Sequence, residues 1–297
     1  MKIAVVIPCL NEEATVSKVV AESKKYLPRA TVYVLDNGST DKTSELAKRA
    51  GAEVIHSPLR GKGHVLRHAM RMIDADYFVM VDGDGTYPMI EAPRLIDLAK
   101  NQNYEMVMGS RLQMGRAEAF RPLHFLGNIG FTTLVRVLFG YPVKDLLTGY
   151  RVFSRRFVHE VNFMSSGFEI ETELTIRAIA QNMAFIEVPV PYSERPAGSR
   201  SKLRTFRDGW IILRTVFRLL RNFRPLMYYL PLSALFLTGA CFGPSLTATA
   251  FSVASALTAT LAFYLATYLD LERFKLRESK MRKSKSDIAS AAKRKSA

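Results

Sequence analysis

The sequence predicts an α/β fold: a mostly parallel, Rossmann-like sheet flanked by helices, then an interfacial amphipathic helix and a two-helix transmembrane hairpin. Three observations support this prediction. Short apolar runs alternate with helical patterns through about the first 190 residues, as in a doubly wound sheet. A basic amphipathic stretch follows, and two apolar segments without a charged side chain come after it.

The predicted strands are short apolar runs, and helical patterns separate most of them. In chain order the expected strands are Ile3–Ile7, Thr31–Leu35, Glu53–His56, Tyr77–Val81, Met106–Gly109 and Ala184–Val188. The expected helices are Thr15–Tyr26, Lys42–Ala50, Gly63–Ile73, Ile90–Lys100 and Glu171–Gln181. Ligands of open α/β sheets bind outside the carboxyl ends of the strands. Pro8, Asp36 and Asp82 all fall at such ends, so we expect the site there.

Two aspartates separated by one glycine follow the fourth predicted strand. Asp82-Gly83-Asp84-Gly85 begins where the apolar strand Tyr77–Val81 ends. Residues i and i+2 of an extended backbone point the same way, so both carboxylates can converge on one divalent cation held against a diphosphate. The same residue types also dominate tight turns, so a plain turn is the competing interpretation.

Composition limits the classes of partner. The chain has 297 residues, of which 48% are apolar, and a formal net charge of +15. This charge calls for an acidic partner: a nucleotide substrate, an anionic membrane or nucleic acid. The first strand runs into Pro8-Cys9-Leu10-Asn11-Glu12, and Gly61-Lys62-Gly63 is neither a dinucleotide fingerprint nor a P-loop. Oxidoreductases and NTPases are therefore disfavoured.

The C-terminal part is predicted to associate with a membrane. Residues 204–225 mix aromatic, aliphatic and arginine side chains, which is typical of a helix in the interface of an anionic bilayer. Residues 226–269 hold two charge-free stretches and predict a transmembrane hairpin, with a buried soluble helix pair as the alternative. The tail, 270–297, is rich in lysine and arginine and predicts disorder. The positive-inside rule places this tail and the N-terminal domain in the cytoplasm.

A set of short motifs resembles family 2 glycosyltransferases of the GT-A fold, and within them the polyprenyl-phosphate sugar synthases of the dolichol-phosphate mannose synthase type. The motifs follow the order of that family across residues 1–203, the predicted catalytic domain. They are Ile7-Pro8-Cys9-Leu10-Asn11-Glu12-Glu13, Asp36-Asn37-Gly38-Ser39-Thr40-Asp41, Arg60-Gly61-Lys62-Gly63, Asp82-Gly83-Asp84, Gly109-Ser110-Arg111, Asp145 with Thr148-Gly149-Tyr150-Arg151, and Glu194-Arg195-Pro196-Ala197-Gly198 with Ser201-Lys202-Leu203.

The resemblance implies roles for individual residues. The donor nucleotide sugar would contact Pro8, Leu10, Glu12, Asp36, Lys62 and Asp82. Asp82 and Asp84 would carry Mg²⁺ or Mn²⁺ bridging the donor phosphates. The acceptor phosphate would bind to Arg111, Arg195, Ser201 and Lys202, since an arginine fork suits phosphate oxygens. The catalytic set implied in this way is Asp84, Arg111, Asp145 and Arg195.

Two departures from the family pattern bear on the donor. Asn37 replaces a frequent second aspartate, and Thr86 stands where mannose synthases often carry glutamine or histidine. A UDP-sugar is therefore favoured over GDP-mannose. The chain's single tryptophan, Trp210, lies outside the Gln-x-x-Arg-Trp motif of the processive synthases, which predicts a non-processive enzyme.

The expected acceptor decides whether a base is needed. A polyprenyl phosphate is largely a dianion at neutral pH, because its second pKa lies near 6, and it attacks without a general base. A sugar hydroxyl on a lipid-linked acceptor would need a carboxylate base, with Asp145, Glu169 and Glu171 as candidates. Glu169 and Glu171 also open a predicted helix, where negative charge is favourable for stability alone. A nucleic-acid-binding role is disfavoured.

Overall fold

The computed structural model describes residues 1–112, 122–196, 202 and 204–231, with six further single positions between 254 and 272. The chain divides into two units, Met1–Val216 and Phe217–Ala297. All described strands lie in the first unit, which also contains most of the predicted site residues.

The core of the first unit is a sheet of seven strands in the order β3-β2-β1-β4-β6-β5-β7. Four of the six strand pairings are parallel, and β6 alone is antiparallel to both of its neighbours. The strands are β1 Ile3–Cys9, β2 Thr31–Asp36, β3 Glu53–His56, β4 Tyr77–Met80, β5 Met106–Ser110, β6 Arg151–Ser154 and β7 Phe185–Pro189.

The six predicted strands are confirmed, and the mostly parallel sheet with them. The sequence prediction missed β6, which pairs Phe153 with Phe78 of β4 and Val152 with Val107 of β5. This strand has four residues and begins with the fully buried Arg151, whose guanidinium donates to the carbonyls of Thr148 and Leu146. A charged residue at the start of so short a run conceals the strand pattern.

The five helices predicted between the strands are also confirmed, with ends shifted by at most two residues. The described helices are α1 Val16–Tyr26, α2 Thr43–Arg49, α3 Lys62–Met72, the 3₁₀ turn η1 Met89–Glu91, α4 Ala92–Asn101, α5 Pro122–Phe139, α6 Arg155–Glu160, α7 Ile170–Ala180 and α8 Thr205–Phe223. The sequence analysis missed α5 and α6. Gly127, Gly130 and paired threonines interrupt the apolar pattern of α5, and α6 has only six residues.

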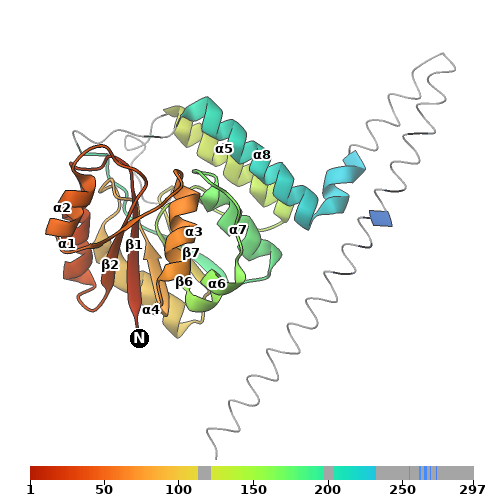
Figure 1. Cartoon of the computed structure of the whole chain (residues 1–297). Helices are drawn as coiled ribbons and strands as arrows, with labels where there is room; N and C mark the ends of the chain where they lie inside the picture. Colours follow the sequence, from red (N-terminus) through yellow and green to blue (C-terminus); the bar gives the residue numbers. More distant parts are fainter. Residues whose placement is uncertain are drawn as a thin grey trace, which may run out of the picture. The chain divides into compact units, whose positions relative to one another are not determined.

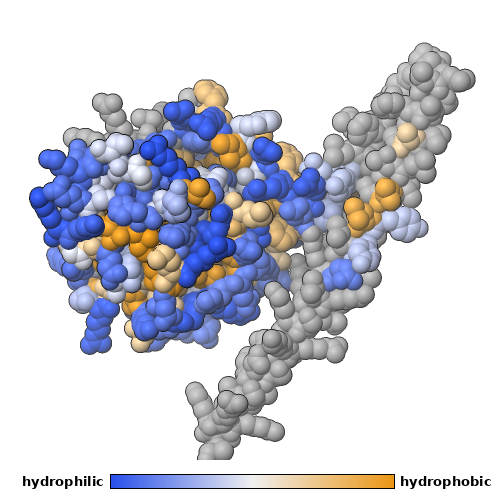
Figure 2. Space-filling model, viewed as in Figure 1, coloured by the Kyte–Doolittle hydropathy of each residue, from blue (hydrophilic) through white to orange (hydrophobic). Residues whose placement is uncertain are grey.

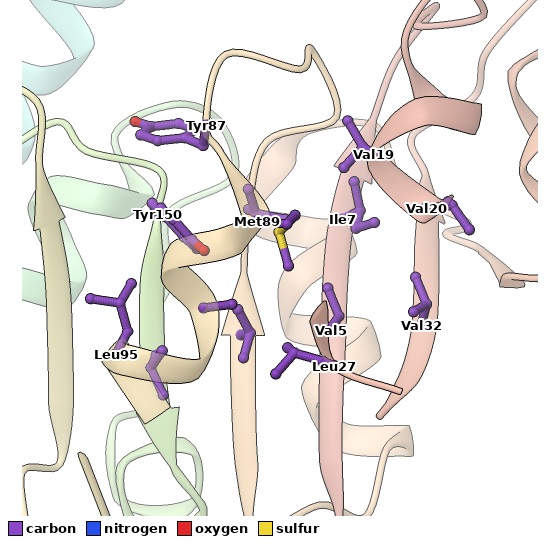
Figure 3. Close-up of a cluster of buried hydrophobic side chains, with 14 of the residues drawn as sticks. Val5, Ile7, Val19, Val20, Leu27, Val32, Tyr87, Met89, Leu95 and Tyr150 are labelled. Atoms are coloured by element: carbon purple, nitrogen blue, oxygen red, sulfur yellow. The ribbon is translucent and has the colours of Figure 1, made fainter. Parts of the chain in front are cut away.

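Hydrophobic residues cover both faces of the sheet, as in a doubly wound fold. One core packs α1, α2 and α4 against the sheet, and Figure 3 shows part of it, including Ile7, Val20 and Leu95. The other core packs α3, α6 and α7 against the opposite face through residues such as Leu66, Phe157 and Leu174. Figure 1 shows α3 and α7 in front of the strands and α1 beside them. Because helices cover both faces of the sheet, the carboxyl edge is the part of the sheet that remains for a ligand.

The predicted membrane segments are described only in part. The expected interfacial stretch 204–225 is confirmed as a helix, α8. The expected spans within 226–269 lie outside the described residues, apart from 226–231 and a few single positions, and so does the tail 273–297. Among the helices that the structure does describe, none has both the length and the apolarity needed to cross a bilayer.

Candidate active site

The Asp82-Gly83-Asp84 turn lies at the carboxyl edge of the sheet, directly after β4. The hydroxyl of Thr15, just before α1, donates to the Gly83 carbonyl at 2.6 Å. A Cβ on Gly83 would collide with the buried Cys9 thiol at the end of β1. The turn is therefore pressed against β1, and only glycine between the two aspartates permits this close approach.

Asp82 is held by the start of α3. The Lys62 ammonium contacts Asp82 Oδ1 at 2.5 Å and Glu171 Oε1, on α7, also at 2.5 Å. Burial acts to raise the pKa of Asp82, but Lys62 outweighs it and lowers that pKa. The pKa of Glu171 is raised, because its burial outweighs the effect of Lys62. Gly149 lies so close that a Cβ there would collide with the Asp82 carboxylate.

Asp84 faces the segment that follows β7. Its Oδ1 accepts hydrogen bonds from the backbone N–H and the hydroxyl of Thr86, at 3.1 and 2.6 Å, and its Oδ2 pairs with Arg195 Nη2 at 2.6 Å. Arg195 also lies 3.8 Å from Glu12 Oε1, which Lys202 contacts at 3.0 Å. Three predicted residues far apart in sequence, Glu12, Asp84 and Arg195, therefore meet at one place.

Arg111 and Asp145 form a buried ion pair rather than two separate groups. The guanidinium donates to both carboxylate oxygens at 2.8 and 2.9 Å, and the backbone N–H of Arg111 donates to Asp145 at 2.9 Å. The amide of Asn128, on α5, donates to the same carboxylate at 2.8 Å. Burial acts to raise the pKa of Asp145, but Arg111 and Asn128 outweigh it and lower that pKa. The Arg111 guanidinium lies over the Tyr192 ring, 5.4 Å from its centroid.

Asp36, at the end of β2, accepts hydrogen bonds from the backbone N–H of Ser39 and the hydroxyl of Ser44, at 3.0 and 2.8 Å. Nδ1 of His56, at the end of β3, lies 3.2 Å from Oδ2, the oxygen that also accepts from Ser44. Burial would raise the pKa of Asp36, but these hydrogen bonds lower it. Pro8 and Leu10, also predicted for the donor pocket, are half-buried beside this edge.

Asp82 and Asp84 are the residues that fit a divalent metal. Both offer hard oxygen ligands, and each attracts a cationic side chain to within 2.6 Å. Among the described residues, no group of three or more His, Cys, Asp or Glu side chains is arranged to bind a metal ion. Two carboxylates completed by substrate phosphates and water are the usual arrangement for Mg²⁺. The pair thus fits a metal whose remaining ligands come from a donor diphosphate.

The structure brings most of the predicted site residues together and adds others. Ser201 lies outside the described residues. Asn128, Tyr192 and Gly149 were missed as contributors, although Gly149 and Tyr192 lie in or beside motifs already singled out. Asn128 belongs to α5, which the sequence analysis did not detect as a helix, so no pattern indicated it.

A separate cavity of about 530 Å³ lies away from this edge, between the end of α3 and α6. Its lining includes Arg67, Arg71, Arg155 and His159 together with apolar residues. None of the predicted site residues lines it.

Comparisons with known proteins identify relatives over about three quarters of the chain. The model of glycosyl transferase family 2 matches residues 4–161. "Glycosyltransferase AglJ" from Haloferax volcanii is 35% identical over 228 residues, 76% of this chain and 75% of the relative. "Dolichyl-phosphate hexose transferase" from the same organism is 34% identical over 214 residues, 72% of this chain and 92% of the relative.

Solved structures share the fold. Glucosyl-3-phosphoglycerate synthase from Mycobacterium tuberculosis, in complex with phosphoglyceric acid, superposes with a TM-score of 0.62 over 73% of this chain and 79% of that chain, at 24% identity. The same enzyme in complex with Mn²⁺, UDP and glucosyl-3-phosphoglycerate gives a TM-score of 0.59 over 74% and 78% of the two chains, also at 24% identity. This likeness establishes a GT-A-like fold.

Proposed function

The chain belongs to glycosyl transferase family 2, and from that premise we propose that it transfers a sugar from a nucleotide-sugar donor to a polyprenyl phosphate, inverting the anomeric carbon. One observation carries the proposal. Four cations from separate segments lie at the carboxyl edge of the sheet: Lys62 and Arg195 contact Asp82 and Asp84, the charge of Arg111 acts on Asp82, and Lys202 contacts Glu12, which Arg195 also faces. The relative named dolichyl-phosphate hexose transferase supports a lipid phosphate as the acceptor.

The donor is proposed to be a UDP-sugar, with its diphosphate at Asp82 and Asp84. The fold neighbour crystallised with Mn²⁺ and UDP supports both the nucleotide and a divalent metal, Mg²⁺ or Mn²⁺. When bound, such a metal neutralises the charge that develops on the leaving diphosphate. Pro8, Leu10, Glu12 and Asp36 are the residues proposed to line the nucleotide pocket.

The charges of the site support an acceptor that is already ionised and attacks without a general base. Asp145 is fully enclosed by Arg111 and Asn128 and has a lowered pKa, which makes it a weak base. Glu169 accepts hydrogen bonds from the backbone N–H groups of Ser166 and Gly167. A phosphate dianion needs no base and requires only to be held in line with the anomeric carbon. Arg111, Arg195 and Lys202, with Ser201, are the groups proposed to hold it.

Glu171 favours a second candidate, transfer to a hydroxyl of a lipid-linked sugar. Its carboxylate is buried beside Asp82, and its pKa is raised, which suits a general base. Its contact with Lys62 counts against this role, since a base must be free to accept a proton from the acceptor.

Two described helices support a membrane-bound acceptor. The exposed face of α8 carries Phe206 and Trp210 together with Arg207 and Arg214, the mixture expected at a lipid interface. Helix α5 exposes Leu126, Ile129 and Val137 along one stripe. The start of α8 contacts α5, where Thr205 lies 2.7 Å from His124, and Figure 1 shows the two helices side by side. Figure 2 shows hydrophobic patches among hydrophilic side chains over them.

We further propose the domain plan expected from the sequence. Residues 1–203 form the catalytic domain, 204–225 an interfacial helix and 226–269 a transmembrane hairpin, while the basic tail 270–297 adheres to anionic lipid. The protein is then an integral membrane enzyme with its catalytic domain and its tail in the cytoplasm.

The test is a transfer assay with membranes that contain the full chain. They are incubated with Mg²⁺, a polyprenyl phosphate and, separately, labelled UDP-glucose, UDP-N-acetylglucosamine or GDP-mannose, and the organic-extractable label is counted before and after mild acid. Acid-labile label from one donor, absent in Asp84→Ala, is the expected result. Acid-stable label would favour the hydroxyl acceptor instead, and absence of label with every donor would contradict the proposed pairing of donor and acceptor.

A further inference from the structure

Each aspartate of the Asp82-Gly83-Asp84 turn is paired with a cation that also contacts a second carboxylate. Lys62 lies between Asp82 and Glu171, 2.5 Å from each. Arg195 lies between Asp84, at 2.6 Å, and Glu12, at 3.8 Å. The first arrangement links α3 with α7, and the second links the segment after β7 with the segment after β1. In both, a cation lies between an aspartate of the turn and a glutamate.

These cations contact the carboxylate oxygens that a divalent metal would use. A metal bound by the carboxylate oxygens of Asp82 and Asp84 would lie within a few ångströms of Lys62 and Arg195, and like charges at that distance repel strongly in a partly buried site. The side chain of Lys62 is only 10% exposed, so it cannot move freely into water. Metal binding therefore requires Lys62 to have another carboxylate within reach, and Glu12 offers one to the more exposed Arg195.

We propose that Glu171 and Glu12 are positioning residues that hold Lys62 and Arg195 when a divalent metal takes Asp82 and Asp84. The inference rests on the proposed function, since it assumes that this turn binds the metal of a nucleotide-sugar donor. Glu171 is 6% exposed and Glu12 is 9% exposed, so each keeps its cation inside the site. Held in this way, Lys62 and Arg195 would stay beside the turn, where they could bind phosphate oxygens of the donor.

This arrangement predicts the sign of a mutational effect. In Glu171→Gln, Lys62 keeps Asp82 as its one carboxylate partner among the described residues, so metal must compete with Lys62 for that oxygen. We expect Mn²⁺ to bind about tenfold more weakly, equivalent to roughly 1.4 kcal/mol. Glu12→Gln is expected to act in the same direction but less strongly, because Arg195 is 32% exposed and can turn toward water.

The experiment measures Mn²⁺ binding to the full chain in detergent micelles, with and without UDP, from the paramagnetic resonance signal of free Mn²⁺. Glu169→Gln is the matched control, because it removes the same charge from the same helix end but from a carboxylate that binds Ser166 and Gly167 backbone N–H groups. Its Mn²⁺ affinity is expected to stay within about twofold of wild type. Circular dichroism checks that each variant is folded.

A double-mutant cycle separates this positioning role from the general effect of removing a negative charge near the metal. Lys62→Gln is expected to bind Mn²⁺ more tightly than wild type, and adding Glu171→Gln to it should change the affinity little. Equal weakening by Glu171→Gln in both backgrounds would overturn the inference and leave the proposed function intact. If wild type binds no Mn²⁺ with or without UDP, the metal-dependent part of the proposed function fails, and the inference fails with it.

Discussion

At the scale of single residues, the pair Arg111–Asp145 shows how one side chain fixes the orientation of another. The Asp145 carboxylate has no exposed surface, and the Arg111 guanidinium is 12% exposed. Asp145 receives the guanidinium, the Arg111 backbone N–H and the Asn128 amide, so its oxygens are used for positioning. Arg111 is therefore held in a fixed orientation over the Tyr192 ring, and Asp145 would contribute to the proposed phosphate binding through it.

Replacing Asp145 by asparagine should destabilise the fold. It leaves the buried guanidinium without its counter-charge, which costs about 3 kcal/mol or more. For a domain of this size that corresponds to a thermal midpoint lower by roughly 6–12 °C, measured by circular dichroism. Glu160→Gln is the control, because its pair with Arg156 is largely exposed and should change the midpoint by about 2–4 °C at most. Equal shifts in the two variants would contradict the role given to Asp145.

At the scale of elements, α8 is amphipathic in an uncommon way. Its inward side buries Ile212, Thr215 and Val216, as an ordinary surface helix does. Its outward side is not simply polar, because Phe206 is 86% exposed and Trp210 is 68% exposed among arginines. Large aromatic side chains left in water are costly, and aromatic rings among cationic groups suit the head-group region of a bilayer.

Trp210 allows a direct test, because it is the only tryptophan in the chain. In proteoliposomes of anionic lipid we expect its emission to shift to the blue and to be quenched by brominated lipid, since the ring enters the interface. Phe206→Ser should reduce the quenching, whereas Leu59→Ser, at an exposed apolar residue after β3, should not. High salt should weaken the effect by screening the arginines. An unshifted emission in lipid would contradict the interfacial role.

At the scale of the whole molecule, several buried carboxylates are kept ionised by hydrogen-bond donors and cations. Asp36 is held by Ser39 and Ser44, Asp145 by Arg111, and Glu173 by Ser165 and Arg177. Burial raises the pKa of each, but the hydrogen bonds and cations outweigh it and lower the pKa. The charged form of these groups is thus part of the folded state.

Stability should therefore fall on the acid side. A carboxylate with a lowered folded pKa stabilises the protein fully above its unfolded pKa, near 4, and loses that contribution as the pH falls through the folded pKa. We expect the thermal midpoint to decrease steadily below about pH 4, because the unfolded chain then binds more protons than the folded one. In Asp145→Asn the decrease should be shallower. An identical acid profile in wild type and variant would show that Asp145 is not among the groups responsible.

The sequence by itself determined the alternation of strands and helices, because the periods of apolar residues in these elements are local properties. It also determined that Pro8, Asp36 and Asp82 would lie at one edge, since parallel strands end on the same side of a sheet. The family could be identified from short motifs, because a motif depends only on the types of its residues and their order along the chain. These local signals were sufficient for the six predicted strands and for the five predicted helices, but not for α5 and α6.

Only the tertiary structure decided which charges meet. Lys62 and Glu171 are 109 positions apart and Lys202 and Glu12 are 190 apart, and no periodic pattern relates such residues. Strand β6 likewise became visible only between β4 and β5, because four residues around a buried arginine form a strand when neighbours supply their hydrogen bonds. The partners of a charged side chain depend on the packing of distant elements, and that packing sets both the orientation of Arg111 and the positions of the cations on Asp82 and Asp84.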